Sequence, residues 1–187
     1  MRRPPLATCL CLLGALALLG PIARSAGAAG ADRAVPSVFF VGKSENRNEV
    51  HYGVALDGSC APAGTSPVFA YWRMHERGPL ATEPLLDREV PAYGIAWQRV
   101  VDRDERGGRV VLGLNALPGR AIAIDSEVDS TPDRTGCTAT ARAMIDGAAA
   151  SLTSVFVQLR WPFGVDYLLL SGRAATDGRP VQERLAH

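Results

Sequence analysis

Apolar and polar residues alternate with a period of two along most of the chain after residue 37. Between residues 49 and 56, for example, Val50, Tyr52, Val54 and Leu56 occupy every second position. Successive side chains of a strand point to opposite faces of a sheet, so this pattern predicts strands with one buried face. We predict about ten such strands, at residues 37–43, 49–56, 67–75, 95–101, 109–114, 121–128, 137–145, 151–160, 165–173 and 180–185.

One segment, residues 82–90, has the features of a helix. Thr82 can cap its first turn, Pro84 suits that turn because the missing N–H needs no partner there, and Pro91 ends it. About ten short strands at regular spacing with one short helix are typical of an antiparallel β-sandwich or a barrel-like meander. We therefore expect a mainly β fold that forms a single domain over residues 37–187.

The first 28 residues have the pattern of a secretory signal peptide. Arg2 and Arg3 precede an apolar run at residues 6–19, and Ala26-Gly27-Ala28 matches a cleavage site. Residues 29–36 are expected to form a disordered linker. We expect export to the periplasm or the extracellular space, with no transmembrane span after cleavage. An uncleaved membrane anchor is the alternative.

Removal of this leader changes the charge and the cysteine content of the chain. Three of the 20 basic residues lie in the leader, so the mature chain, with its 19 acidic residues, is slightly acidic. Nucleic-acid binding needs a basic face and is therefore not expected. Of the 4 cysteines, Cys60 and Cys137 remain, and in an oxidising compartment we predict a disulfide between them. The alternative is that Cys137 is a small buried hydrophobic residue.

A polar run directly after the first predicted strand is a candidate ligand-binding segment. It contains Lys43, Ser44, Asn46 and Asn48. Amide groups both donate and accept hydrogen bonds, and Lys43 with Arg47 can hold an anion. The alternative is a simple hairpin turn, where Asn is favoured because it tolerates a left-handed backbone.

Aromatic residues and one arginine add to the candidate ligand-binding residues. Alternation places Arg73 on the same strand face as Tyr71, where it can receive a ligand carboxylate or phosphate. In the structural alternative Arg73 pairs with a glutamate of the predicted helix, Glu89 first, and docks that helix on the sheet. Tyr93 can line an apolar pocket or pack in the core.

Residues suited to catalysis are present without a recognisable catalytic spacing. His51 or His75 with Glu76 or Glu89 would allow acid–base chemistry. The common zinc-ligand and nucleophile motifs do not occur in the sequence. We therefore assign no catalytic residue, no metal ligand and no cofactor, and interpret the histidines as surface residues.

Several short motifs resemble a bacterial family known as domain of unknown function 4833. An apolar strand precedes Ser44, Asn46 and Asn48, and Tyr52 lies in the following strand. The pair Tyr71-Trp72, the tripeptide Ala92-Tyr93-Gly94 and a closing VDYLLLSGR segment complete the resemblance, which spans most of the mature chain. This family has no assigned activity, so the resemblance supports the fold and implies no mechanism.

These observations lead to two functional hypotheses. The first is an exported, non-enzymatic β domain of the cell envelope that binds a small molecule or an envelope protein. The second is an envelope hydrolase that uses a His/Glu pair. Contact of either histidine with a carboxylate inside a pocket favours the hydrolase.

Overall fold

The computed structural model describes residues 37–129, 136–160 and 164–186. The predicted signal peptide and linker lie outside these residues. The described part of the chain contains eleven strands, one 3₁₀ helix and one short α-helix. The strands are β1 (Phe39–Lys43), β2 (Asn46–Val54), β3 (Val68–Arg73), β4 (Thr82–Pro84), β5 (Ile95–Asp104), β6 (Gly107–Leu114), β7 (Ala121–Asp129), β8 (Gly136–Ile145), β9 (Ala148–Leu159), β10 (Val165–Ala174) and β11 (Pro180–Ala186).

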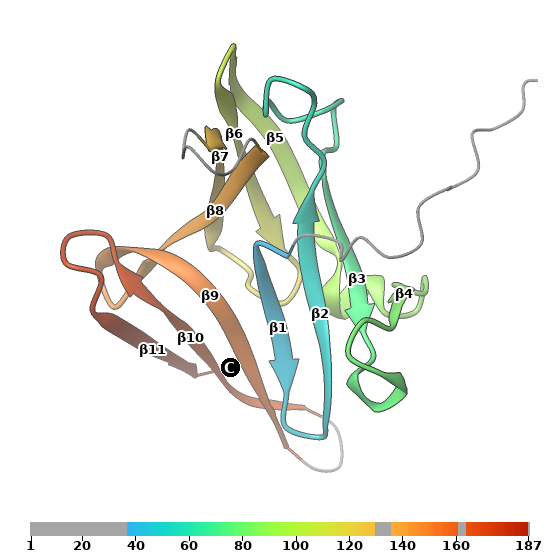
Figure 1. Cartoon of the computed structure of the whole chain (residues 1–187). Coiled ribbons are helices and arrows are strands. Elements are labelled where there is room, and N and C mark those ends of the chain that lie inside the picture. Colours follow the sequence, from blue (N-terminus) through green and yellow to red (C-terminus); the bar gives the residue numbers. More distant parts are fainter. Residues whose placement is uncertain (1–36, 130–135, 161–163, 187) are drawn as a thin grey trace, which may run out of the picture. The chain divides into compact units, whose positions relative to one another are not determined.

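All eleven strands belong to one sheet that bends into two facing parts (Figure 1). Its strand order is β4-β3-β2-β1-β9-β8-β7-β6-β5, and β10 pairs with β9 and β11. The long strand β9 is the branching point, because its first residues pair with β8 and residues 154–157 pair with β1. The sheet does not close into a barrel, and its two parts face each other as in a sandwich.

The predicted mainly β fold is confirmed, but the pairing is not antiparallel throughout. β1 and β9 run parallel, with Phe40 opposite Ser154 and Lys43 opposite Val157. Parallel neighbours need a long connection, and here more than a hundred residues separate the paired positions in sequence. Alternation within each strand carries no information on the direction of so distant a partner.

The core forms where the alternating apolar residues of the two parts meet. Val50 and Tyr52 of β2 are fully buried, as are Leu112 of β6 and Ile124 of β7. The Tyr52 ring stacks on Phe39 with centroids 4.6 Å apart. The buried Tyr52 hydroxyl donates to the Tyr93 carbonyl at 2.7 Å, which satisfies it inside the core.

The helix predicted at residues 82–90 is wrong in position. Residues Thr82–Pro84 form β4, in which Pro84 lies opposite Tyr71 at the edge of the sheet. The helix α1 spans only Val90–Tyr93, so Pro91 lies in its first turn instead of beyond its end. Proline is compatible with both an edge strand and a helix start. Pro84 lies in a strand here because its segment pairs with β3 at the edge of the sheet.

The predicted disulfide between Cys60 and Cys137 is present, with the Cα atoms 5.3 Å apart. It joins the loop between β2 and β3 to the start of β8, across 77 residues of sequence. No helix among the described residues is long and apolar enough to span a membrane.

Candidate functional site

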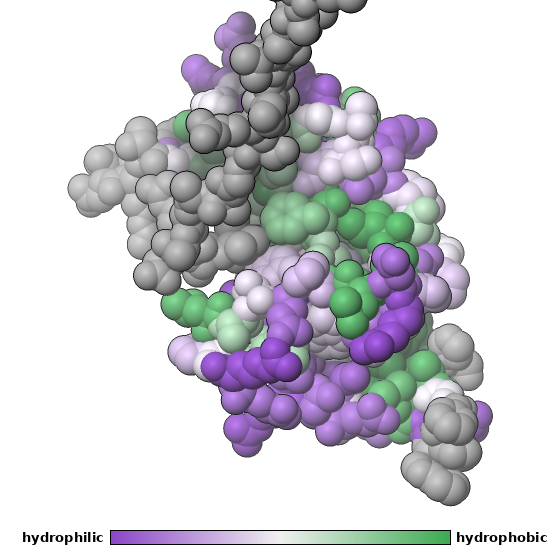
Figure 2. Space-filling model, turned by 90° about the vertical axis from the view of Figure 1, so that its right-hand side faces the viewer, coloured by the Kyte–Doolittle hydropathy of each residue, from purple (hydrophilic) through white to green (hydrophobic). Residues whose placement is uncertain are grey.

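Strands β1, β2 and β3 carry polar side chains on two opposite faces. Lys43, Asn48 and Trp72 lie on the face that continues the core, whereas Glu49 and His51 lie on the outward face. The side of the molecule on which β3 and β4 lie in Figure 1 is seen face-on in Figure 2, with hydrophilic side chains below a group of apolar ones. Each face of the three strands holds a separate candidate site.

The core-side face ends in a cavity of about 250 Å³, which we call the Lys43 cavity. It lies between the polar ends of β1 and β2 and the chain segment that follows β3. Its lining residues are Lys43, Asn46, Asn48, Trp72, Met74, Glu83, Pro84, Leu86, Arg88 and Glu89.

Lys43 is the only lysine of the chain, and most of its side chain is buried. The side chain is 18% exposed, and its ammonium lies 5.4 Å from the centroid of the Trp72 ring. Its ion-pair partner among the described residues is the exposed Glu45, whose carboxylate lies 4.0 Å away. The ammonium is therefore held by an aromatic face and a distant carboxylate, an arrangement that leaves it able to attract an anion.

Glu89 fixes the opposite wall of the Lys43 cavity. One of its carboxylate oxygens accepts hydrogen bonds from Trp72 Nε1 at 2.8 Å and from the Leu86 backbone N–H at 2.9 Å. Burial raises the pKa of Glu89, but these hydrogen bonds and the positive charges of Arg88 and Lys43 outweigh it, so the pKa lies below its usual value. Glu89 is therefore an anionic wall residue.

Asn48, which lines the same cavity, has an unpaired acceptor. Its Oδ1 atom is buried and has no hydrogen-bond partner among the described residues. Its backbone N–H donates to Oδ1 of Asn46 at 3.0 Å, which holds the turn between β1 and β2. An unpaired buried acceptor costs stability, so this atom is suited to receive a donor from a ligand.

The structure divides the predicted ligand-binding residues among several places. Lys43, Asn46 and Asn48 meet in the Lys43 cavity. The Ser44 hydroxyl instead accepts from the Leu159 backbone N–H at 3.1 Å and ties the turn to β9. Tyr93 packs edge-on against Trp72 and lines a second cavity, also of about 250 Å³ and mostly apolar.

Tyr71 and Arg73 lie on the outward face of β3, away from the Lys43 cavity. The predicted pairing of Arg73 with Glu89 is wrong. Arg73 Nη1 donates to the Pro79 carbonyl at 2.7 Å, and its buried Nε atom has no partner among the described residues. Glu89 approaches from the Trp72 side, and adjacent strand residues point to opposite faces.

A larger hollow of about 740 Å³ runs along β5, β6 and β7. The carboxylate of Asp125 on its floor lies between two guanidinium groups, 2.5 Å from Arg109 Nε and 2.7 Å from Arg142 Nε. Hydrogen bonding from Arg109 lowers the pKa of Asp125 against the effect of burial. The Asp125 carboxylate is thus neutralised within the protein and is not available to a ligand.

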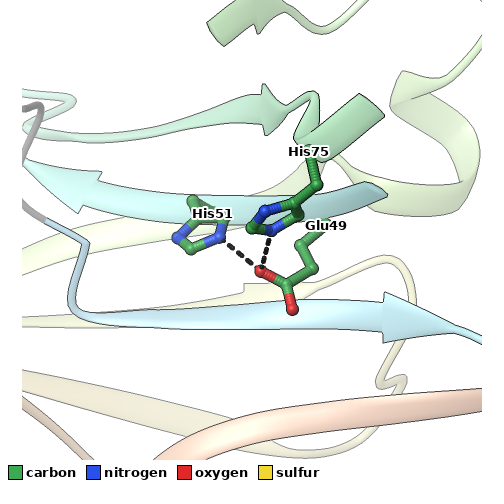
Figure 3. A group of neighbouring side chains, drawn as sticks. All are labelled: Glu49, His51 and His75. Atoms are coloured by element: carbon green, nitrogen blue, oxygen red, sulfur yellow. Dashed lines mark hydrogen bonds and ion pairs between the residues drawn. The ribbon is translucent and has the colours of Figure 1, made fainter. Parts of the chain in front are cut away.

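The outward face of β2 brings together three groups that the sequence did not connect. Oε2 of Glu49 lies 2.9 Å from His51 Nε2 and 3.0 Å from His75 Nε2 (Figure 3). The side chains are 27%, 12% and 38% exposed for Glu49, His51 and His75. We call this group the Glu49 cluster.

Local structure explains how the Glu49 cluster forms. Glu49 and His51 are two residues apart on β2 and therefore share a face. β3 ends at Arg73, and the chain then turns into the 3₁₀ helix η1 (His75–Arg77), which brings His75 back over Glu49. The Glu-x-His spacing is a signal that the sequence contained, whereas the approach of His75 depends on the end of β3.

A serine orients the ring of His51. His51 Nδ1 lies 2.7 Å from Ser37 Oγ, and this hydroxyl also donates to the Phe39 carbonyl at 3.1 Å. Burial lowers the pKa of His51, and the hydrogen bond to Glu49 only partly opposes this effect. Burial raises the pKa of Glu49, but hydrogen bonds from His75 and His51 outweigh it and hold the pKa below its usual value.

Comparison with known proteins identifies a family but no activity. The family described as Domain of unknown function (DUF4833) matches residues 39–184, and the chain belongs to this family. The resemblance inferred from the sequence motifs is thereby confirmed. No curated protein and no solved structure matches the chain.

Proposed function

We propose that this protein is an exported binding module of the bacterial cell envelope. Its ligand is a small polar molecule that carries an anionic group and a hydrogen-bond donor, and the Lys43 cavity is its binding site. The observation that carries this proposal is the buried, unpaired Oδ1 atom of Asn48, a residue that lines the same cavity as Lys43.

The chemistry of the Lys43 cavity supports this class of ligand. A ligand anion can pair with Lys43, while an N–H or O–H group of the same ligand donates to Asn48. The Trp72 ring offers an apolar contact surface and is held in place by Glu89. A volume of about 250 Å³ lies just below the usual range for ligand pockets, which favours a small ligand.

Two features support export. The N-terminal residues have the composition of a secretory leader. Disulfides persist in oxidising compartments, and Cys60 and Cys137 form one.

The Glu49 cluster bears on the hydrolase alternative. His51 and His75 both contact a carboxylate, as that hypothesis requires, but the carboxylate belongs to Glu49 instead of Glu76 or Glu89. The cluster lies on the outward face of β2, and the cavities described above are lined by other residues. A binding module is therefore the better supported function.

The single lysine allows a direct test of the proposed site. Reductive ¹³C-methylation labels Lys43 and the N-terminus only, so an NMR titration reports on this cavity. Glycolate carries a carboxylate and a hydroxyl, whereas acetate lacks the hydroxyl and ethylene glycol lacks the carboxylate. We expect glycolate to shift the Lys43 signal at the lowest concentration, and this preference to disappear in Asn48→Leu.

Equal responses to the three probes in the wild-type protein would contradict the proposed ligand class. A control is provided by Arg179→Met, because Arg179 is an exposed cation in the turn between β10 and β11. This variant should respond to glycolate as the wild-type protein does.

A further inference from the structure

The Ser37 hydroxyl selects the tautomer of His51. It can donate to the Phe39 carbonyl at 3.1 Å or to His51 Nδ1 at 2.7 Å. When it donates to His51, the ring donates from Nε2 to the Glu49 carboxylate at 2.9 Å. When it donates to Phe39, His51 Nδ1 donates to Ser37 Oγ, and the neutral ring turns the lone pair of Nε2 toward Glu49.

In this second tautomer, the lone pairs of His51 Nε2 and Glu49 Oε2 repel each other unless a positive charge lies between them. His75 Nε2 approaches the same carboxylate oxygen at 3.0 Å from the other side. The three atoms thus surround a position that attracts a cation, either a proton or a metal ion. Two imidazole nitrogens and one carboxylate oxygen are a donor set that proteins use for zinc and related ions.

We propose that Glu49, His51 and His75 form a binding site for a divalent transition-metal ion, with Zn²⁺ as the ion that fits best. The site is distinct from the Lys43 cavity, because it lies on the opposite face of β2. Ser37 is a positioning residue that keeps His51 Nε2 directed at the ion.

The geometry requires only a small adjustment. Zinc bonds of about 2.0–2.1 Å in tetrahedral arrangement place neighbouring donor atoms about 3.3 Å apart. The donor atoms of the cluster lie 2.9 and 3.0 Å apart in two pairs, and all lie within 4.8 Å of one another. His75 is the most exposed of the three and lies at the start of η1, which contains no buried residue, so its ring is free to move toward the ion.

The surroundings set two further features of the site. Three protein ligands leave a fourth coordination position for water or another ligand on the exposed side. Arg73 lies opposite Glu49 in the register of β2 and β3, so its positive charge opposes a bound cation. Magnesium and calcium prefer oxygen ligands and are not expected to compete.

Binding of Zn²⁺ by the purified full chain, stripped of metal by dialysis against a chelator, tests this proposal. Titration against a chromophoric chelator should show one Zn²⁺ per chain, unaffected by excess Mg²⁺. Glu49→Gln, His51→Ala and His75→Ala should each weaken binding beyond the about 10- to 100-fold that loss of an outer-shell partner causes. Ser37→Ala should weaken it within that range, and Ser37→Thr should restore it.

Two variants serve as matched controls. His187→Ala removes the only other histidine of the chain and should leave Zn²⁺ affinity unchanged. Arg73→Met removes the opposing charge and should tighten binding. Zn²⁺ should also raise the unfolding midpoint of the wild-type protein but not that of Glu49→Gln, whose amide oxygen still accepts from His75 and keeps the fold.

Substitution with Co²⁺ identifies the ligand atoms. The proposal requires a spectrum of nitrogen and oxygen ligands without a thiolate charge-transfer band. A thiolate band would place the metal on cysteine sulfur and overturn the proposal. Equal Zn²⁺ affinity of the wild-type protein, Glu49→Gln and His75→Ala would overturn it as well, since a proton would then occupy the position between the three groups.

Discussion

Asn48 illustrates at the residue scale how one polar side chain interrupts an apolar strand face. It occupies the same face of β2 as the buried Val50 and Tyr52, yet its Oδ1 atom has no partner among the described residues. A site that binds a ligand commonly retains such groups at the expense of stability. Substitution of Asn48 should therefore change the free energy of unfolding of the ligand-free protein.

We predict that Asn48→Leu raises the free energy of unfolding by about 1 kcal/mol, because it removes a buried acceptor that lacks a partner. Urea unfolding of the two proteins measures the difference. Asn46→Leu is the matched control. Its side chain is exposed and accepts from the Asn48 backbone N–H, so this change should lower stability by about 0.5–1 kcal/mol. A loss of stability in both variants would contradict the assigned role of Asn48.

At the scale of elements, β1 to β3 act as a scaffold with a site on each face. The register places Phe40, His51 and Tyr71 side by side across the three strands, and their rings stack in sequence at 5.3 and 5.7 Å between centroids. This ladder positions the Glu49 cluster. On the other face, Trp72 and Glu89 connect β3 to the segment before α1.

The disulfide has its effect at the same scale, since it holds the loop between β2 and β3 against β8. Closing a loop of 77 residues stabilises the folded state by about 4 kcal/mol in the chain-entropy description. We predict that the free energy of unfolding of the double variant Cys60→Ser/Cys137→Ser is lower by this amount, as measured by urea unfolding. Addition of a thiol reductant should destabilise the wild-type protein and leave the double variant unchanged; any other pattern contradicts the prediction.

At the scale of the whole molecule, Glu183 connects distant parts of the sheet. Its carboxylate accepts from Arg120, in the loop before β7, and from the Asp146 backbone N–H in the β8–β9 turn at 2.9 Å. Hydrogen bonds from these two groups lower the pKa of Glu183 below its usual value despite partial burial. The Glu183 carboxylate therefore binds a proton more weakly in the folded protein than in the unfolded chain.

A lowered pKa in the folded state contributes stability above the pKa of the unfolded chain and loses it as the pH falls further. We predict that stability declines below about pH 4.3 and that Glu183→Gln makes this decline shallower, as measured by the unfolding midpoint between pH 6 and 3 in steps of about one pH unit. Glu105→Gln, in the exposed β5–β6 turn, is the control and should follow the wild-type curve. If the unfolding midpoints of all three proteins fall equally as the pH is lowered, the loss of stability does not come from Glu183.

The cellular location is a property of the whole chain and has its own prediction. The leader pattern predicts cleavage near Ala28. Expression in a bacterial host, followed by cell fractionation and N-terminal sequencing, should find a mature product in the periplasm or the medium. A product that still begins at Met1 and remains in the cytoplasm would contradict both the cleavage and the proposed export.

The amino-acid sequence determined the features that depend on neighbouring residues. Alternation identified ten of the eleven strands, and Val50, Tyr52 and Val54 are buried on one face as predicted. The disulfide followed from the two cysteines outside the predicted leader, and the motifs around Asn46 and Asn48 identified the family. Each of these inferences uses local spacing or composition.

Only the tertiary structure decided which distant residues meet. The parallel pairing of β1 with β9, the edge strand at Thr82–Pro84 and the contact of Glu89 with Trp72 depend on how the sheet bends. His75 reaches Glu49 because β3 ends at Arg73 and the chain turns there. The alternation of side chains within a strand specifies its faces, whereas the free energy of packing and pairing between remote segments selects the partners of each face.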